Sequence, residues 1–318
     1  MHYELDGRKH LTAHTANPVA ATQFRMQEIR EINIRGKVIK RHPKSWFTEA
    51  LTSFEIGGHL RRTNRVGSVG GNDVPHPGER TSPEGKPISN IILLTIPDDE
   101  FSEIRRSLEY IELPARTILH EPKRKLESAY FLNSGMTSLV FNTNHGESVE
   151  VGLVGKEGFT PIPAAAGLRR TPHQAVMQVG GDGFHISLDA LESALKTTPQ
   201  LQQVMNRYAA VHGMQVAQTA GCNRLHDLDQ RLARWLLLTQ DRVGSGLLKI
   251  THDFLATMLG TDRPSVSLAA GMLRKKKIIE YTHGAVKVLN RKKLESAACE
   301  CYGLIQQFYG EMVPKRAS

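Results

Sequence analysis

The residues best suited to chemistry lie between residues 247 and 290, where side chains that bind nucleic acid are closely spaced. Arg263 can donate two hydrogen bonds to a guanine edge, and the hydroxyl groups of Thr261 and Ser265 suit phosphate. The other candidates for DNA contact are Pro264, Ser267, Leu268, Lys275, Lys276 and His283. This set predicts contact with duplex DNA, and Arg263 is the first choice for reading a base.

Capping signals around these residues predict two short helices joined by a tight turn. Thr251 can cap the first helix, and Gly260 ends it because glycine tolerates left-handed backbone. Asp262 can cap the second helix, with Pro264 in its first turn, where a missing amide hydrogen costs nothing. The buried stripe of that helix consists of Val266, Ala269, Ala270 and Leu273. Its leading side chains are therefore free to enter a major groove.

A basic run follows the second helix. Residues 274–277 read Arg-Lys-Lys-Lys, and two short strands joined at His283 and Gly284 come next. In isolation such a run is an ordinary solvated helix end that complements the helix dipole. Beside a helix-turn-helix we expect it to lie along the phosphate backbone, where it adds salt-dependent affinity. Residues 247–290 thus predict a winged helix-turn-helix.

Composition is consistent with that interpretation without proving it. The 318 residues are enough for two domains, and 41 Lys plus Arg against 32 Asp plus Glu give a net charge of +9. A basic chain suits a polyanionic partner, although many basic proteins share this property. The three cysteines form no disulfide framework, and neither a secretory signal nor a membrane-length apolar run is evident. We expect a cytoplasmic protein with no membrane partner.

Two regions precede the winged helix. Residues 1–88 are polar, basic and interrupted by glycine pairs and a Pro/Gly-rich run, so we expect a poorly patterned, partly disordered extension. An acidic helix start at residues 97–100 follows. Short apolar or alternating runs then recur at residues 110–113, 117–120, 129–132, 137–142, 148–154, 175–179 and 184–186. Strands at such spacing predict a small antiparallel barrel or sandwich.

Helical spacing begins at Leu188, and Pro199 opens a long helix that runs to Leu225. Its narrow apolar stripe consists of Leu201, Val204, Met205, Tyr208, Val211 and Val216. A stripe this narrow is typical of a coiled-coil seam, so we favour a dimerising helix. The alternative is a helix packed on its own barrel.

With these parts in this order, residues 90–302 resemble the Crp/Fnr family of transcription regulators, most closely over residues 223–237 and 250–289. The resemblance implies an α+β fold. Its parts are an N-terminal antiparallel β-barrel, a cyclic-nucleotide-binding-like jelly roll, at residues 89–198, a long dimerisation helix at 199–225, a C-terminal winged helix-turn-helix at 226–302, and a tail at 303–318.

The same resemblance implies the function. It implies a sequence-specific DNA-binding transcription regulator that acts as a homodimer on a pseudo-palindromic operator and contacts RNA polymerase. Arg263 matches an arginine of the family's recognition pattern, but Pro264 and Leu268 stand where that pattern has a glutamate and a second arginine. We therefore expect a different operator.

The barrel departs from the cyclic-nucleotide binders of the family. Gly155 and Glu157 fall in the region that holds the ribose, and Arg170 and Thr171 in the region that holds the phosphate. However, Lys156 displaces the expected glutamate, and two prolines interrupt the short helix whose amides would bind phosphate. We expect a degenerate effector barrel without a cofactor, with cyclic nucleotide binding as the alternative.

The cysteines do not predict a metal site. No cysteine precedes Cys222, so the iron–sulfur cluster of oxygen-sensing relatives cannot assemble in its usual place. The spacing of Cys299 and Cys301 places both thiols on one C-terminal helix, about 200° apart, which favours packing over chelation. The spacing of the 14 histidines suggests no metal site either.

Two other function classes compete with a regulator. An enzyme acting on DNA needs clustered carboxylates or an activated nucleophile, and the compact acidic cluster at residues 98–100 is better explained as a helix start. We therefore expect no enzymatic activity. An interaction module that has lost DNA binding is the second alternative, and the retained Arg263, hydroxyls and basic helix end argue against it.

Overall fold

The computed structural model describes residues 31–32, 38–39, 75–282 and 284–310. The chain divides into two units, Met1–Gly70 and Gly71–Ser318. In the first unit two short strands, β1 (Glu31–Ile32) and β2 (Val38–Ile39), pair antiparallel. The rest of the expected extension up to residue 74 lies outside the described residues.

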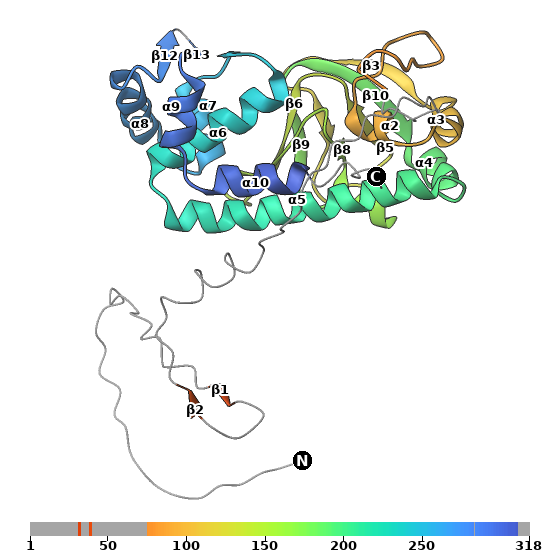
Figure 1. Ribbon diagram of the computed structural model, residues 1–318, viewed down its shortest axis with the longest axis horizontal. Helices are drawn as coiled ribbons and strands as arrows, with labels where there is room; N and C mark the ends of the chain where they lie inside the picture. The colour runs from red at the N-terminus through yellow and green to blue at the C-terminus, as the bar shows by residue number, and fades with distance from the viewer. Residues whose placement is uncertain (1–30, 33–37, 40–74, 283, 311–318) are drawn as a thin grey trace, which may run out of the picture. The chain divides into compact units, whose positions relative to one another are not determined.

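Eight strands of the second unit form two four-stranded antiparallel sheets (Figure 1). One sheet has the order β3 (Glu109–Leu113), β10 (Gly181–Ser187), β5 (Ser128–Leu132) and β8 (Phe159–Thr160). The other has the order β4 (Ile118–His120), β9 (Gln174–Val179), β6 (Met136–Asn142) and β7 (Ser148–Val154). The predicted antiparallel β-domain, called the barrel domain below, is confirmed. The two-residue strand β8 was not predicted.

The barrel domain begins with a short segment anchored by one arginine. Residues from 75 onward precede α2 (Ile91–Thr95) and α3 (Asp98–Arg105). The Arg80 guanidinium donates hydrogen bonds to the carbonyl oxygens of Leu93 (2.6 Å) and Ile96 (2.8 Å) and pairs with Asp98 (2.6 Å). Ile88 is fully buried. Part of the segment assigned to the extension thus packs on the barrel domain, and the boundary at residue 88 stays a prediction.

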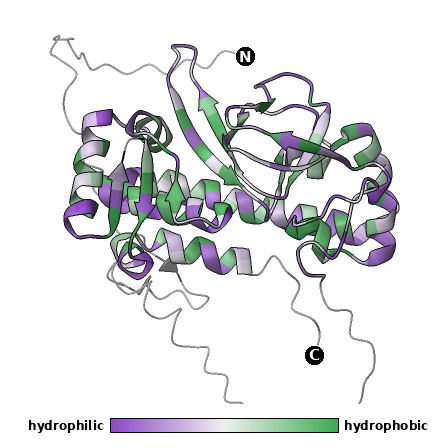
Figure 2. Ribbon diagram, turned by 90° about the horizontal axis from the view of Figure 1, so that it is seen from above, coloured by the Kyte–Doolittle hydropathy of each residue, from purple (hydrophilic) through white to green (hydrophobic). Residues whose placement is uncertain are grey.

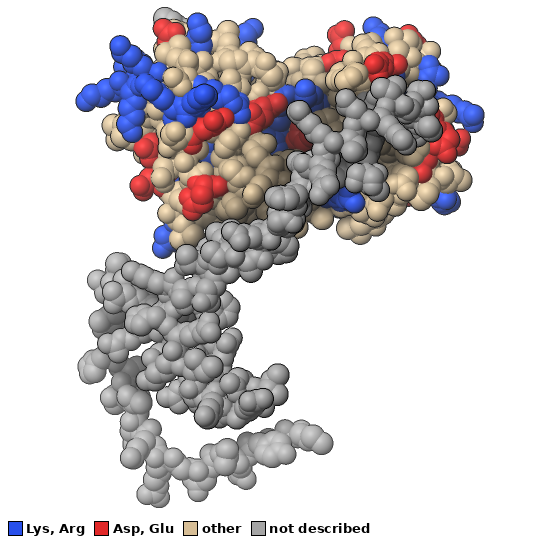
Figure 3. All heavy atoms as spheres, viewed as in Figure 1, with Lys and Arg blue, Asp and Glu red and all other residues tan. Residues whose placement is uncertain are grey.

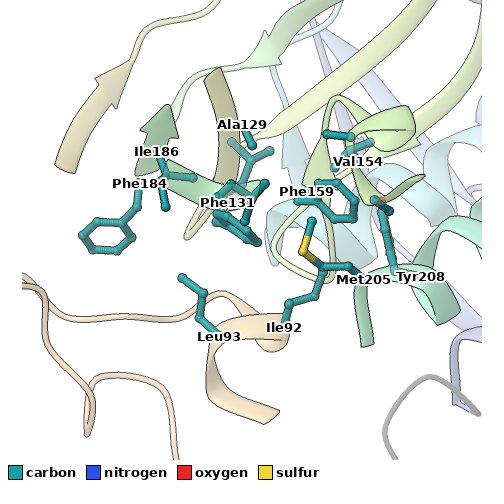
Figure 4. Packing of buried hydrophobic residues seen from close by; sticks show 14 of the residues in the cluster. Ile92, Leu93, Ala129, Phe131, Val154, Phe159, Phe184, Ile186, Met205 and Tyr208 are labelled. Atoms are coloured by element: carbon teal, nitrogen blue, oxygen red, sulfur yellow. The ribbon is translucent and has the colours of Figure 1, made fainter. Parts of the chain in front are cut away.

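The long helix α5 (Pro199–Leu225) packs against the barrel domain, preceded by α4 (Leu188–Leu195). In Figure 4, Met205 and Tyr208 of α5 point toward Phe159 and Phe131. The ring centroids of Phe159 and Tyr208 are 5.5 Å apart. Five of the six stripe residues, all but Val216, are therefore buried in the chain's own core, as the alternative interpretation expected, and dimerisation through α5 stays a prediction. An apolar stripe of this width fits either partner, so spacing alone could not distinguish them.

A second core builds the C-terminal part around α6 (Leu228–Val243). It contains β11 (Leu247–Leu248), α7 (His252–Leu259), α8 (Arg263–Lys275), β12 (Ile279–Thr282), β13 (Ala285–Val288), α9 (Arg291–Ala297) and α10 (Cys301–Gly310). Its sheet has the order β11-β13-β12, so the predicted wing hairpin is confirmed and gains a third strand. Hydrophobic and hydrophilic residues alternate along these elements, as expected where one face is buried (Figure 2).

α10 occupies residues that the sequence grouped into a C-terminal tail. It lies beside α5 and also contacts α6 (Figure 1). Gly244, at the end of α6, has φ +70°, which lets the chain turn sharply toward β11. No helix in the described ranges has the length and hydropathy needed to cross a membrane.

Candidate nucleic-acid interface

The turn between α7 and α8 is fixed at both sides by the predicted caps. Thr251 accepts a hydrogen bond from the Phe254 amide (3.2 Å), and Gly260 ends α7 with φ +60°. Asp262 accepts from both the amide (2.8 Å) and the hydroxyl (2.9 Å) of Ser265. These two bonds lower the pKa of the Asp262 carboxyl. The first turn of α8 is therefore held rigidly before any ligand arrives.

α8 buries one face and presents the other to solvent, as the sequence predicted. Its buried residues are Val266, Ala269, Ala270 and Leu273. On the outer face the Arg263 side chain is 65% exposed and Leu268 is 70% exposed, while Pro264 and Ser267 are also exposed. Thr261 and Ser265 are half-buried beside them. An apolar side chain as exposed as Leu268 suits contact with a thymine methyl group.

Two polar contacts orient this outer face. The Arg263 Nε lies 3.5 Å from the Asp253 carboxylate of α7, a solvent-exposed pair that contributes little and can open when a ligand binds. The Ser267 hydroxyl lies 2.9 Å from Nδ1 of His252, whose ring packs 4.0 Å from that of Tyr281 in the wing. Burial, and then the charge of Arg263, lower the pKa of His252.

His252 and Tyr281 thus connect α7, α8 and the wing, and we did not predict either as a site residue. In the sequence, His252 directly follows the helix cap Thr251, and neither of the residues that it contacts lies within one helical turn of it. Its contacts with α8 and the wing are made to Ser267 and Tyr281, which are 15 and 29 positions away in the sequence.

Basic side chains surround the exposed face of α8. Those that are exposed are Arg263, Arg274, Lys275, Lys276 and Lys277, together with Lys249 and Lys287 of the wing sheet region. Figure 3 shows lysine and arginine side chains gathered at the end of the molecule where Figure 1 places α8 and the wing. Of the predicted contact residues, Arg263, Pro264, Ser267, Leu268, Lys275 and Lys276 are therefore exposed on α8 or at its C-terminal end, and Thr261 and Ser265 are half-buried. His283 lies outside the described residues.

The four barrel residues considered for effector binding have different surroundings. The Glu157 carboxylate pairs with the Arg242 guanidinium of α6 at 2.8 Å and accepts from the amide of Gly155 at 3.1 Å. Arg170 is exposed, and Thr171 is buried before β9. Glu157 therefore already binds a cation of this chain, in the region where a ribose was considered.

The neighbouring space is also filled by the chain itself. A methyl group added at Gly158 would lie 1.9 Å from Cζ of Tyr208, so the Tyr208 ring rests directly on the backbone there. Next to it, Arg242 donates to Gln215 of α5 at 3.0 Å and to Tyr309 of α10 at 3.1 Å. Tyr208 and Arg242, which fill this region, thus also connect the barrel domain to α5, α6 and α10.

Comparison with known proteins agrees with this architecture. A family profile described as a Crp-like helix-turn-helix domain matches residues 230–297. No curated protein is similar enough to the chain to match it. Among solved structures, a protein assigned to the crp/fnr family of transcriptional regulators from Eubacterium rectale ATCC 33656 is 18% identical with a TM-score of 0.51; the match covers 64% of this chain and 94% of that one.

Two further structures share the fold. The c-di-GMP-responsive global regulator CLP of Xanthomonas campestris is 14% identical with a TM-score of 0.51, over 60% of this chain and 99% of its own. FixK2 of Bradyrhizobium japonicum is 14% identical with a TM-score of 0.50, over 60% and 98% of the two chains. The predicted resemblance is therefore confirmed: this chain carries a Crp-like helix-turn-helix domain on the fold of the Crp/Fnr transcription regulators.

Proposed function

We propose that the chain is a sequence-specific DNA-binding transcription regulator that reads its operator with the first two turns of α8. The observation that carries this proposal is the exposed, pre-capped face containing Arg263, Ser267 and Leu268. A helix of this kind fits the major groove, where an arginine near its N-terminus can bond two acceptors of one guanine. The exposed lysines at the other end of α8 add affinity for phosphate without sequence preference.

The test separates base reading from backbone binding. The operator is first recovered by footprinting on genomic DNA, and gel shifts then compare it with random DNA at several salt concentrations. Arg263→Ala should weaken operator binding about tenfold to a hundredfold and random-DNA binding much less. Lys276→Ala should weaken both equally and lower the salt slope by about one.

Arg106→Ala is the matched control, because Arg106, the residue that follows α3 in the barrel domain, is 78% exposed and its loss removes the same charge. It should leave both affinities nearly unchanged. Equal losses for Arg263→Ala on operator and random DNA would refute base reading by that residue. Failure of the intact chain to bind any DNA would favour the interaction-module alternative.

We also propose that the regulator is a homodimer joined along the outer face of α5. The exposed positions of α5 alternate in steps of three and four: Gln203, Asn206, Ala210, Gly213, Ala217, Ala220 and Arg224. This is the spacing of a coiled-coil seam, on the face opposite the stripe buried in the barrel domain. Four small residues allow close approach of two helices, and the exposed side chains of Met214, Leu304 and Phe308 lie beside them.

Ala217→Glu tests this seam. A buried charge facing its own copy in a dimer should convert the protein to a monomer in light-scattering measurements and weaken operator binding with it. Ser193→Glu is the control, since it places the same charge on an exposed position of α4. If Ala217→Glu forms dimers over the same range of protein concentration as wild type, α5 is excluded as the interface.

The resemblance to Crp/Fnr regulators supports two finer proposals. The dimer contacts RNA polymerase at its promoter, which transcription assays with purified polymerase test directly. The barrel domain acts without a bound cyclic nucleotide, because Glu157 is already paired with Arg242. Calorimetric titration with cyclic AMP and cyclic GMP should give no saturable heat, and stoichiometric binding of either would overturn that proposal.

A further inference from the structure

All three cysteines of the chain meet in one buried place, although they come from distant segments. Cys222 lies in the last turn of α5, Cys299 lies in the turn between α9 and α10, and Cys301 is the first residue of α10. Each is at most 3% exposed. The expectation that Cys299 and Cys301 share one helix was wrong, because residues 298–300 are not helical and the change of direction turns both thiols to the same side.

A histidine completes the group. His226 is the C-cap of α5, four positions after Cys222, so the two side chains share one face of the helix end. The ligand atoms of Cys222, His226, Cys299 and Cys301 all lie within 4.8 Å of one another. The Sγ atoms of Cys222 and Cys299 are 3.5 Å apart, and Sγ of Cys301 is 3.6 Å from Nδ1 of His226.

These separations fit one tetrahedral ion. With zinc–sulfur bonds of 2.3 Å, tetrahedral geometry places two sulfur ligands about 3.8 Å apart, and a sulfur and an imidazole nitrogen slightly closer. Three thiolates and one histidine form a common ligand set of structural zinc sites. The four ligands of an iron–sulfur cluster are divided among two or more iron atoms, so as a set they span a longer distance than these four do.

Two neighbouring side chains are placed as the surroundings of a metal site require. Nε2 of His226 lies 3.1 Å from the Glu300 carboxylate, which fixes the ring so that Nδ1 faces the cysteines. This carboxylate–histidine arrangement is typical of zinc sites. The Gln218 amide donates to Sγ of Cys301 at 3.0 Å, as it would to a thiolate.

We propose that Cys222, His226, Cys299 and Cys301 bind one divalent metal ion of the zinc class. The site lies where α5 ends and α6 begins, since His226 caps the first helix and Asp227 caps the second. A bound ion would link the connection between α5 and α6 to the start of α10, and would so fix the angle between α5 and α6. α6 packs directly on α8, so the consequence for operator binding rests on the proposed function, whereas metal binding itself does not.

The experiment uses the full-length chain, reduced and freed of metal with a chelator. Titration with Co²⁺ should end at one ion per chain, with the visible bands of tetrahedral cobalt and a thiolate-to-cobalt charge-transfer band, and Zn²⁺ should displace it. Cys299→Ser and His226→Gln should each lower Co²⁺ affinity by at least about tenfold. His145→Gln is the control, because His145 is an exposed histidine of the β6–β7 turn.

A second variant avoids the risk that loss of a buried ligand unfolds the chain. Glu300 is 72% exposed, so Glu300→Gln should fold normally and still bind one Co²⁺, with affinity lowered about 10- to 100-fold. The proposal is overturned if the reduced wild type gives no tetrahedral cobalt spectrum. It is also overturned if Cys299→Ser binds as tightly as wild type, or if the isolated protein carries a Cys222–Cys299 disulfide. Gel shifts on the same preparations show separately whether DNA binding survives such a result.

Discussion

The buried carboxyl group of Glu150 offers a sharp test of how the barrel domain and α6 are joined. Glu150 of β7 accepts a hydrogen bond from the Trp235 indole of α6 at 2.8 Å and another from the Ser138 hydroxyl. Burial raises the pKa of Glu150 from its ordinary value of 4.5 to about 7, although these two bonds and nearby arginines oppose the rise. The Glu150 side chain is therefore uncharged in mild acid and ionised above neutral pH.

The sign and size of the effect follow from this pKa. Between pH 4.5 and 7 the folded chain binds more protons at Glu150 than the unfolded chain does, so the free energy of unfolding falls as pH rises through this window. The full loss is about 3 kcal/mol, and the part between pH 5.5 and pH 8 is about 2 kcal/mol. Glu150→Gln keeps an acceptor for Trp235 but carries no charge. The variant should therefore gain about 2 kcal/mol over wild type at pH 8 relative to pH 5.5.

Urea unfolding of both proteins at the two pH values, followed by circular dichroism, measures this double difference. Other titrating groups contribute equally to wild type and variant and cancel. Glu147→Gln is the matched control, because Glu147 is an exposed carboxylate in the preceding turn. A double difference below about 0.5 kcal/mol for Glu150→Gln would show that burial does not raise the pKa of this carboxyl group, and would refute the expected loss of stability.

Three further changes test the packing between α5 and the barrel domain by unfolding measurements. Tyr208→Phe should leave stability unchanged or raise it by about 1 kcal/mol, because the buried hydroxyl has no hydrogen-bond partner among the described residues; a loss above that size would contradict this. Gly158→Ala should destabilise by about 1–3 kcal/mol through its clash with Tyr208, whereas Gly303→Ala, which has open space on α10, should not. Burial, aided by Arg242, lowers the pKa of His212 to about 3, so stability is lost as pH falls from 6.5 toward 3. His212→Gln should reduce this loss of stability at acid pH, and an unchanged dependence of stability on pH would exclude His212 as its cause.

Elements with local end signals were predictable from the sequence. Thr251, Gly260, Asp262 and Pro199 act within one helical turn of their own positions, and the structure starts or ends a helix at each. The exposed face of α8 followed from the same information, because once its buried stripe is known the remaining positions must face outward. The strands longer than two residues were found from apolar alternation for the same reason.

Features that depend on distant partners were not predictable. Strands β8 and β11 have two residues each, and only their neighbours make them strands. Glu157 and Arg242 are 85 positions apart, and nothing near either residue identifies the other. The assumption of one helix across Cys299 and Cys301 misplaced both thiols, since helical periodicity does not apply across a turn. The sequence did contain a usable signal, namely a cysteine and a histidine at helical spacing.

The contacts around α6 suggest where regulation acts on DNA binding. Trp235 joins α6 to β7, Arg242 joins it to Glu157, α5 and α10, and the cluster at Cys222 lies at its N-terminal end. In contrast, α8 meets solvent on its outer face and is supported from behind by α6 and α7. We expect a signal arriving at the barrel domain to reach α8 through α6 and also through α7, which contacts both β7 and α8, and a signal at the cysteines to reach it through α6. The leading side chains of α8 should meanwhile keep the orientation that the Asp262 cap sets. Substitutions at Arg242 or Trp235 should accordingly change operator affinity without changing base preference, which selection of preferred sites from a randomised pool can measure.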